Sequence, residues 1–240
     1  MLIRITNHCT MGCSHCFTES TPKGEHMTRD TFVKAMTLAK ALGDPMFLIS
    51  GGEPTDHPEV VEFLRMAMHM GSHTSLLSNG MWLTDPKFDP KARQEILDTV
   101  DVIQVTNDDR YYPRRIEQVK HPKIGYETRI RQVSPFGRAK TNGIESARQS
   151  PLCFNLRSFA RSFKSLPAAI MSQRLRGSFC TPTISVNGDV LAGESTSCGA
   201  IGTVYDSIET LNAGIIGLKC NRCGLVDGLP PTHKQAIGEI

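Results

Sequence analysis

The spacing of the cysteines is the feature that most constrains this chain of 240 residues. Seven of the eight cysteines fall into two sets with the close spacing of metal-cluster ligands. The first set reads C-x3-C-x2-C and the second ends in Cys-Asn-Arg-Cys; their members are Cys9, Cys13 and Cys16, and then Cys180, Cys198, Cys220 and Cys223. Three thiolates leave one iron of a four-iron cube open to bind another molecule, whereas four thiolates close the cube. The sequence therefore predicts one open and one closed metal centre.

Other roles for these cysteines stay open on spacing alone. His8 or His15 could complete a zinc site with the first set, and zinc could occupy the second. A Cys-x2-Cys pair could also be redox-active. A disulfide framework is typical of small secreted chains, and this chain is large and begins without the apolar core of a signal peptide. No apolar run approaches the roughly 20 residues of a membrane span. We therefore predict reduced thiols and a cytoplasmic location.

Charge is strongly segregated along the chain. Residues 110–180 hold 15 Lys and Arg against 3 Asp and Glu, between two acidic segments. Such a segment either forms a positive face that attracts a polyanion or pairs with its acidic flanks. Because guanidinium groups suit phosphates and carboxylates, we predict substrate-binding roles for arginines of this segment. The candidates are Arg110, Arg129, Arg131 and Arg138.

Strands and helices alternate through the first 133 residues. The expected strands are 2–6, 46–50, 73–77, 101–106 and 127–133, and the expected helices are 29–42, 58–70, 89–99 and 112–119. This alternation predicts crossover units and a parallel sheet, curved or closed into an incomplete barrel. After residue 135 the pattern changes. We expect helical or irregular structure over 145–178, a hairpin turning through Asn187-Gly188, and a helix near 207–214.

Three loops in this order resemble those of the radical S-adenosylmethionine (SAM) enzymes. The cysteine triplet follows the first expected strand, Gly51-Gly52-Glu53-Pro54 follows the second, and Asn79-Gly80 follows the third. The resemblance spans about residues 2–138. It implies an α/β fold, a partial (β/α)6 barrel, and a [4Fe–4S] cluster on Cys9, Cys13 and Cys16. In that family the open iron binds SAM, and an electron from the cluster splits SAM into a 5′-deoxyadenosyl radical that abstracts hydrogen from the substrate.

The resemblance also implies which residues contact SAM. They are His15, Gly51, Gly52, Glu53, Ser78 and Asn79. The glycines let the backbone approach the methionyl end, since they lack a Cβ. Glu53 would bind the amino group by a charge-assisted hydrogen bond. His15 stands where the family usually has an aromatic residue, and its planar ring can still pack beside adenine.

The second set of cysteines resembles the Twitch module, a shortened relative of the SPASM extension that carries one auxiliary [4Fe–4S] cluster. The segments Val186–Val190 and Ile201–Val204 between its cysteines, and Pro135–Ala139 before them, add to this resemblance. It implies a small C-terminal hairpin and helix module and a second cluster. The expected division is a radical SAM core at 1–138, a basic helical connection at 139–179 and Twitch at 180–240. Cys153 is left over, either as a buried side chain or as a replacement ligand.

Together these features predict a radical SAM oxidoreductase or isomerase that acts on an anionic organic substrate. A nucleotide, a modified nucleic-acid base or a phosphorylated metabolite would fit, with the substrate radical oxidised or rearranged near the auxiliary cluster. The alternatives are a peptide maturase, an alcohol dehydrogenase of antibiotic synthesis, and a non-catalytic metal-binding module that binds nucleic acid. The enzyme would need an external one-electron reductant such as flavodoxin or ferredoxin. The sequence does not identify the substrate, the atom attacked or the oligomeric state.

Overall fold

The fold was analysed in a computed structural model, which describes residues 1–71, 73–130, 133, 136–144, 156, 160–175, 182–193 and 199–218. The predictions for Arg131, Cys153 and the second set of cysteines (Cys180, Cys198, Cys220 and Cys223) lie outside the described residues.

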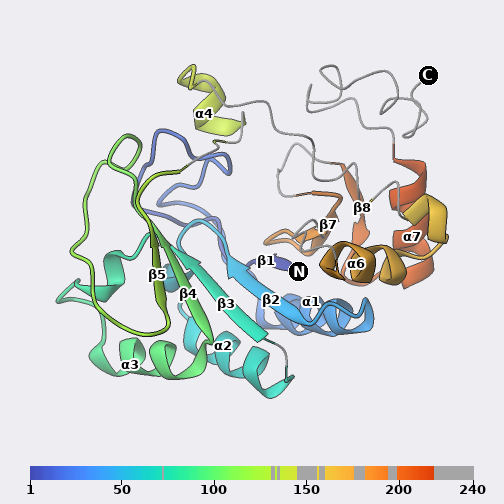
Figure 1. Cartoon of the computed structure of the whole chain (residues 1–240), viewed down its shortest axis with the longest axis horizontal. Helices are drawn as coiled ribbons and strands as arrows, with labels where there is room; N and C mark the ends of the chain where they lie inside the picture. The colour runs from blue at the N-terminus through green and yellow to red at the C-terminus, as the bar shows by residue number, and fades with distance from the viewer. Residues whose placement is uncertain are drawn as a thin grey trace.

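A single sheet of eight strands, in the order β5-β4-β3-β2-β1-β6-β7-β8, organises the described chain (Figure 1). The strands are β1 (Leu2–Arg4), β2 (Met46–Ser50), β3 (His73–Ser78), β4 (Val102–Thr106), β5 (Ile124–Glu127), β6 (Thr183–Ile184), β7 (Asp189–Leu191) and β8 (Ala200–Thr203). Strands β1 to β5 run parallel, β6 is parallel to β1, and β7 and β8 are antiparallel. The α/β class and the parallel, partial-barrel sheet are therefore confirmed.

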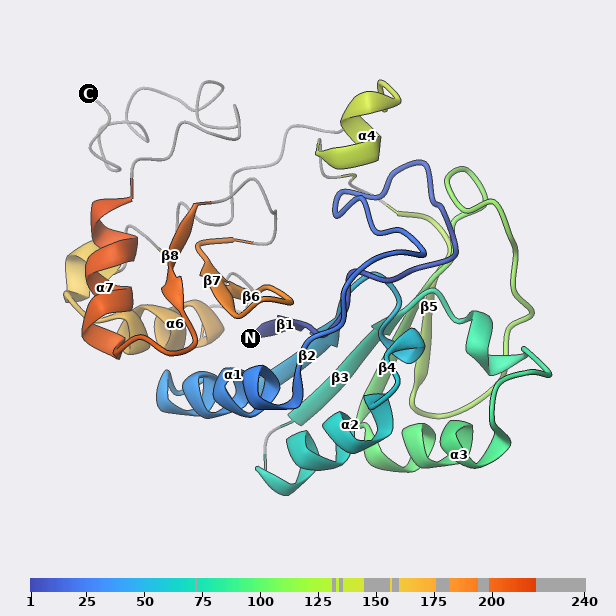
Figure 2. The same cartoon turned by 180° about the vertical axis from the view of Figure 1, so that it is seen from behind.

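Helices cover one face of the parallel strands. Figure 2 shows α1, α2 and α3 side by side on that face, with α6 and α7 beside β7 and β8. The helices are α1 (Arg29–Ala41), α2 (Val60–His69), α3 (Pro90–Thr99), α4 (Gly137–Thr141), α6 (Leu166–Leu175) and α7 (Ile208–Gly217). The first begins as expected, because the Thr28 hydroxyl accepts a hydrogen bond from the Thr31 amide at 3.2 Å. Within the described residues, every helix is too short or too polar to cross a membrane.

The core lies between these helices and the sheet. Phe32 of α1 and Phe63 of α2 are fully buried and stack with ring centroids 4.1 Å apart. Phe47 and Ile49 of β2 are equally buried beneath them. Each such side chain contributes about 1.5–3 kcal/mol to folding through burial. Helix packing thus fixes one face of β1 to β4 and leaves the opposite face for the functional site.

The expected helix over 112–119 is wrong, because this segment is a loop. Pro113 disfavours helical geometry at Tyr112. The Tyr126 hydroxyl accepts a hydrogen bond from the Val119 amide at 2.7 Å and donates to the Val119 carbonyl at 3.1 Å. A side chain of β5 thereby satisfies backbone groups that a helix would otherwise pair. The fifth strand also lies earlier than expected, at Ile124–Glu127 rather than 127–133, because Ile124 and Tyr126 pack on the core.

The hairpin predicted at Asn187-Gly188 is confirmed, and Gly188 takes a φ of +87°, which its lack of a Cβ allows. The first strand of this hairpin, β6, pairs with β1. The sheet therefore runs on from the parallel strands into the hairpin without interruption. The domain division at 138 and 180 stays a prediction.

Candidate active site

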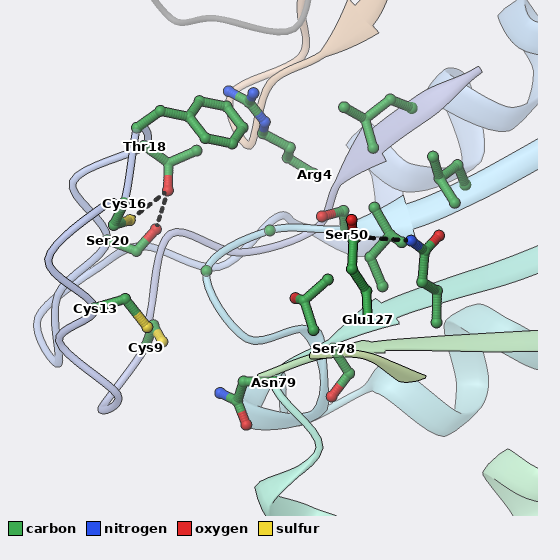
Figure 3. Close-up of a pocket in the computed structure, with 18 of the residues that line it drawn as sticks. Arg4, Cys9, Cys13, Cys16, Thr18, Ser20, Ser50, Ser78, Asn79 and Glu127 are labelled. Carbon is green, nitrogen blue, oxygen red and sulfur yellow. Dashed lines mark hydrogen bonds between the residues drawn. The ribbon is translucent and has the colours of Figure 1, made fainter. Parts of the chain in front are cut away.

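The cysteine loop leaves the carboxyl end of β1 and is tied down by backbone hydrogen bonds. The Gly52 amide donates to the Thr6 carbonyl at 2.7 Å, and the Glu53 amide donates to the His8 carbonyl at 2.8 Å. Cys9 and Cys13 are each 8% exposed, and Cys16 is half-buried. In Figure 3 the three cysteines lie on one loop facing Ser78 and Asn79 at the end of β3. The structure thus brings the predicted cluster ligands and SAM-binding loops to one edge of the sheet.

Gly52 allows this loop to seat against the end of β2. A Cβ on Gly52 would lie 2.2 Å from the His8 carbonyl oxygen and 3.0 Å from the Cys9 Cβ. Both neighbours belong to the loop that carries the cysteines. The glycine is therefore required by the fold of the site itself, in addition to any approach of a cofactor.

The short helix α4 holds the opposite side of the cysteine loop. Arg138 donates from Nε to the Cys13 carbonyl and from Nη1 to the Ser20 carbonyl, both at 2.9 Å. Its backbone amide donates to the Cys16 carbonyl at 2.9 Å. Gly137, at a φ of +54°, lets the backbones touch, since a Cβ would lie 2.8 Å from the Cys16 carbonyl oxygen. Arg138 lines the cavity as predicted for a substrate-binding residue, but its guanidinium group also clamps the loop.

The donor set of the cysteine loop fits an iron–sulfur cluster. Burial raises the pKa of the Cys13 thiol to about 12, helped by the neighbouring Cys9 and Cys16, and burial also raises the pKa of Cys9. Binding a metal must therefore displace thiol protons. Among the described residues, no three His, Cys, Asp or Glu side chains converge as ligands of one ion. A [4Fe–4S] cube takes each thiolate on a different iron, so three cysteines on one loop suit such a cluster.

His15 is a neutral ring within this loop. Its ring centroid lies 5.0 Å from that of Tyr111 and 5.1 Å from that of Tyr112. Burial lowers its pKa to about 4, so the imidazole is uncharged at pH 7. Its Nδ1 atom is buried without a hydrogen-bond partner in the described part of the chain. His15 lines the cavity, so it is available to contact a bound ligand.

Glu53 lies behind the cavity wall rather than in it. It is 3% exposed and is not among the described residues that form the cavity wall. Its carboxylate accepts hydrogen bonds from the Thr55 amide and hydroxyl at 3.2 and 2.7 Å, from the Ser78 hydroxyl at 2.9 Å and from the Asn79 amide at 2.8 Å. Burial raises the pKa of Glu53, although these hydrogen bonds oppose that effect. The carboxylate thus joins the loop after β2 to the end of β3, whose Ser78 and Asn79 do line the cavity.

A cavity of about 620 Å³ extends from the cysteine loop along the face of the sheet that lacks helices. Its apolar wall includes Leu2, Met11, Phe17, Leu48, Leu77 and Val133. Its polar wall includes Arg4, Ser50, Ser75, Gln104, Thr106 and Glu127. Glu127 is the only carboxylate among the described lining residues, and it accepts a long hydrogen bond of 3.4 Å from the Gln104 amide (Figure 3). The volume lies within the range of about 300–1,000 Å³ that is typical of small-molecule sites.

Arg110 and Arg129, which were also predicted to bind substrate, stand outside this cavity in an ion-pair cluster. Arg110 contacts Asp108 at 2.5 Å, and Arg129 contacts Asp109 at 3.0 Å. The side chain of Asp108 is fully buried, and the Arg110 guanidinium group holds its pKa well below the usual range. Arg115 also pairs with Asp109, at 2.7 Å. The two acidic residues just before the basic segment therefore pair with three of its arginines.

We expect Asp108→Asn to lower the free energy of unfolding at pH 7 by about 1–3 kcal/mol, because it leaves buried donors without their charged acceptor. The folded pKa of Asp108 lies below its unfolded value of about 3.9. The carboxylate therefore stabilises the fold above that value, and the contribution is lost as the pH falls toward the folded pKa. Denaturant titrations at pH 7 and pH 3 should show the difference between variant and wild type shrinking at pH 3. A difference that stays constant would contradict this assignment. The Asp109 side chain is more exposed than that of Asp108, so Asp109→Asn should lower the free energy of unfolding by less.

Sequence reasoning missed several residues of the site. Thr18 and Ser20 contact the cysteine loop, and nothing in their spacing distinguishes them from surface residues. Arg4 and Glu127 lie at the carboxyl ends of β1 and β5 and line the cavity. These two could have been found, because charged residues at the carboxyl ends of parallel strands are typical of sites in α/β folds.

The comparisons with known proteins agree with this geometry. The family model described as the radical SAM superfamily matches residues 3–133. The PqqA peptide cyclase of Ruegeria pomeroyi is 34% identical over 94 residues, which cover 37% of this chain and 24% of that protein. The AdoMet-dependent heme synthase of Methanosarcina barkeri is 35% identical over 83 residues, 33% of this chain and 24% of that protein. The matched region thus spans about a quarter of these curated relatives.

Two solved structures share the fold at low sequence identity. The structure of BtrN in complex with AdoMet and 2-DOIA has a TM-score of 0.59 at 12% identity and covers 91% of this chain and 81% of its own. Streptococcus suis SuiB bound to the precursor peptide SuiA has a TM-score of 0.52 at 11% identity and covers 93% and 69%. The family match spans more than half of the residues and includes the cysteine triplet and both loops predicted to bind SAM. This chain therefore belongs to the radical SAM superfamily.

Proposed function

We propose that this radical SAM enzyme generates a 5′-deoxyadenosyl radical at Cys9, Cys13 and Cys16 and uses it to abstract hydrogen from a peptide. The observation that carries the proposal is the cavity of about 620 Å³, which the cysteine loop and the loops after β2 and β3 enclose at one end. When bound, a [4Fe–4S] cluster with one open iron supplies the electron that splits SAM. An external one-electron donor such as flavodoxin or ferredoxin would reduce the cluster again.

In this proposal the residues around the cysteine loop bind SAM and shield the cluster from water. Gly51 and Gly52 present their backbone to the methionyl end of SAM, and Ser78 and Asn79 contact its polar groups. The neutral ring of His15 packs beside adenine. Met11, which is 2% exposed, keeps water from the thiolates. Glu53 acts from behind, since its carboxylate orients Ser78 and the Asn79 amide rather than facing the cavity.

A peptide suits this cavity better than the anionic small molecule expected from the basic segment. Arg110 and Arg129 are paired with Asp108 and Asp109 and do not line the cavity. Of the two described arginines that do line it, Arg138 donates to the Cys13 and Ser20 carbonyls and Arg4 lies over the Phe17 ring. The apolar wall and the carboxylate of Glu127 suit a side chain with a donor group. Peptide cyclases also stand among the relatives that match part of this chain. A cavity of about 620 Å³ has room for the cofactor and one side chain of a longer substrate.

The auxiliary cluster remains part of the proposal. Cys180, Cys198, Cys220 and Cys223 would hold it within a Twitch module at 180–240, after a core at 1–138 and a connection at 139–179. Oxidation of a substrate radical releases one electron, and a nearby cluster is a suitable acceptor.

Anaerobic reconstitution tests the function. With iron and sulfide, the chain should bind about eight irons if both clusters form, or about four if only the first does. With SAM and dithionite it should release 5′-deoxyadenosine, measured by chromatography and mass spectrometry. Zinc binding without SAM cleavage would contradict the assignment.

The proposal that the substrate is a peptide needs a separate experiment. Short open reading frames adjacent to the gene should be co-expressed with the enzyme and analysed by mass spectrometry. A loss of hydrogen from one peptide, absent with a Cys16→Ala variant, would support the proposal. Turnover of a nucleotide or phosphorylated metabolite, with every peptide unchanged, would overturn it.

A further inference from the structure

Two hydroxyl groups form a chain that ends on one of the predicted cluster ligands. The Cys16 Sγ atom lies 3.2 Å from the Thr18 Oγ1 atom, which lies 2.8 Å from the Ser20 Oγ atom (Figure 3). Ser20 is 3% exposed, and its carbonyl accepts a hydrogen bond from Arg138. The two linked hydroxyl groups are therefore held in place by Arg138 of α4, on the far side of the cysteine loop.

Ligand chemistry fixes the direction of the protons in this chain. A cysteine that binds metal has lost its proton, so the Cys16 sulfur can only accept. The Thr18 hydroxyl must then donate to Cys16, which leaves its oxygen free to accept from Ser20. Hydrogen bonds arranged head to tail polarise one another, so Ser20 strengthens the bond that Thr18 makes.

We propose that Thr18, supported by Ser20, is a positioning residue that raises the reduction potential of the cluster on Cys9, Cys13 and Cys16. The inference rests on the proposed function, because it requires that cluster. A hydrogen bond draws electron density from a ligand sulfur and stabilises the more negative, reduced state. Within the described residues, Cys9 receives a comparable bond only from a backbone group, the Met11 amide at 3.5 Å. Among those residues, Thr18 is therefore the side chain through which a substitution can change this effect.

Thr18→Val tests the idea, because valine keeps the shape of threonine and removes the hydroxyl. Redox titration of the reconstituted holoenzyme, followed by the EPR signal of the reduced cluster, gives the midpoint potential. We expect Thr18→Val to lower the equilibrium constant for reduction of the cluster about tenfold, which is a shift of about 59 mV to lower potential for one electron. Thr18→Ser keeps the donor and should stay near the wild type, and Ser20→Ala should shift in the same direction by less.

Controls separate this inference from the proposed function. Thr37→Val removes an exposed threonine hydroxyl on α1 and should leave the potential unchanged. Wild-type protein without a reducible cluster would defeat the proposed function itself. A reducible wild-type cluster whose potential is the same in Thr18→Val, at equal iron content, would overturn only the role of Thr18. Should Thr18→Val fail to load iron, Ser20→Ala decides: a lowered potential supports the chain of hydroxyls, and an unchanged one rejects it.

Discussion

Replacing Cys13 with Ala is expected to abolish formation of 5′-deoxyadenosine and to lower the iron content by about four per chain. Cys13 lies at the centre of the triplet and is 8% exposed, so water cannot easily take the place of its thiolate. Two remaining thiolates on a short loop cannot hold a cube with one open iron. Iron analysis and product release by the anaerobic, dithionite-reduced protein measure both effects.

The control for this variant comes from the same loop. Ser14→Ala removes a hydroxyl that donates to the Tyr111 carbonyl at 3.3 Å and should keep both the cluster and SAM cleavage. A Cys13→Ala protein that cleaves SAM at the wild-type rate would show that the triplet is not the ligand set.

Gly52→Ala is expected to disrupt the site as strongly, for a packing reason. The new Cβ would lie 2.2 Å from the His8 carbonyl oxygen, a backbone atom that cannot turn aside as a side chain can. Overpacking of this kind costs about 1–3 kcal/mol or more. Because the displaced backbone leads directly to Cys9, the loss should appear both in thermal unfolding and in iron uptake.

Gly125→Ala is the matched control. Its Cβ would meet no atom within 4 Å, so this variant should melt and load iron like the wild type. If Gly52→Ala also behaved like the wild type in both measurements, the close contact between the two loops would not exist in solution.

Much of the parallel sheet could be predicted, because the signals are local. Thr28 at the start of α1 and the apolar residues of β2 act within their own segments. The error at 112–119 arose where Pro113 disfavours a helix and where Tyr126, seven residues beyond Val119, decides the backbone hydrogen bonding. The Asn187-Gly188 turn was predicted, but the pairing of its first strand with β1 depends on contacts across more than 170 residues.

The candidate site also has a part that could be predicted from the sequence and a part that could not. The cysteine triplet and the two glycines could be placed together because loops at the carboxyl ends of neighbouring parallel strands meet at one edge. The positions of Arg110 and Arg138 could not be predicted from the sequence. Charge counting did not show that Arg110 pairs with Asp108, two residues away, or that Arg138 reaches back to Cys13. Such partners depend on side-chain geometry, which composition does not contain.

The pairing of β6 with β1 limits how an extended peptide can bind by β-strand addition. Strand addition requires a strand with unused backbone donors and acceptors along one side. β1, which leads into the cysteine loop, is flanked by β2 and β6 and offers no such side. Within the described strands, only β5 and β8 are terminal in the sheet. A guest strand recruited in this way would lie alongside Ile124–Glu127 or Ala200–Thr203, and the first of these ends at the carboxylate that lines the cavity.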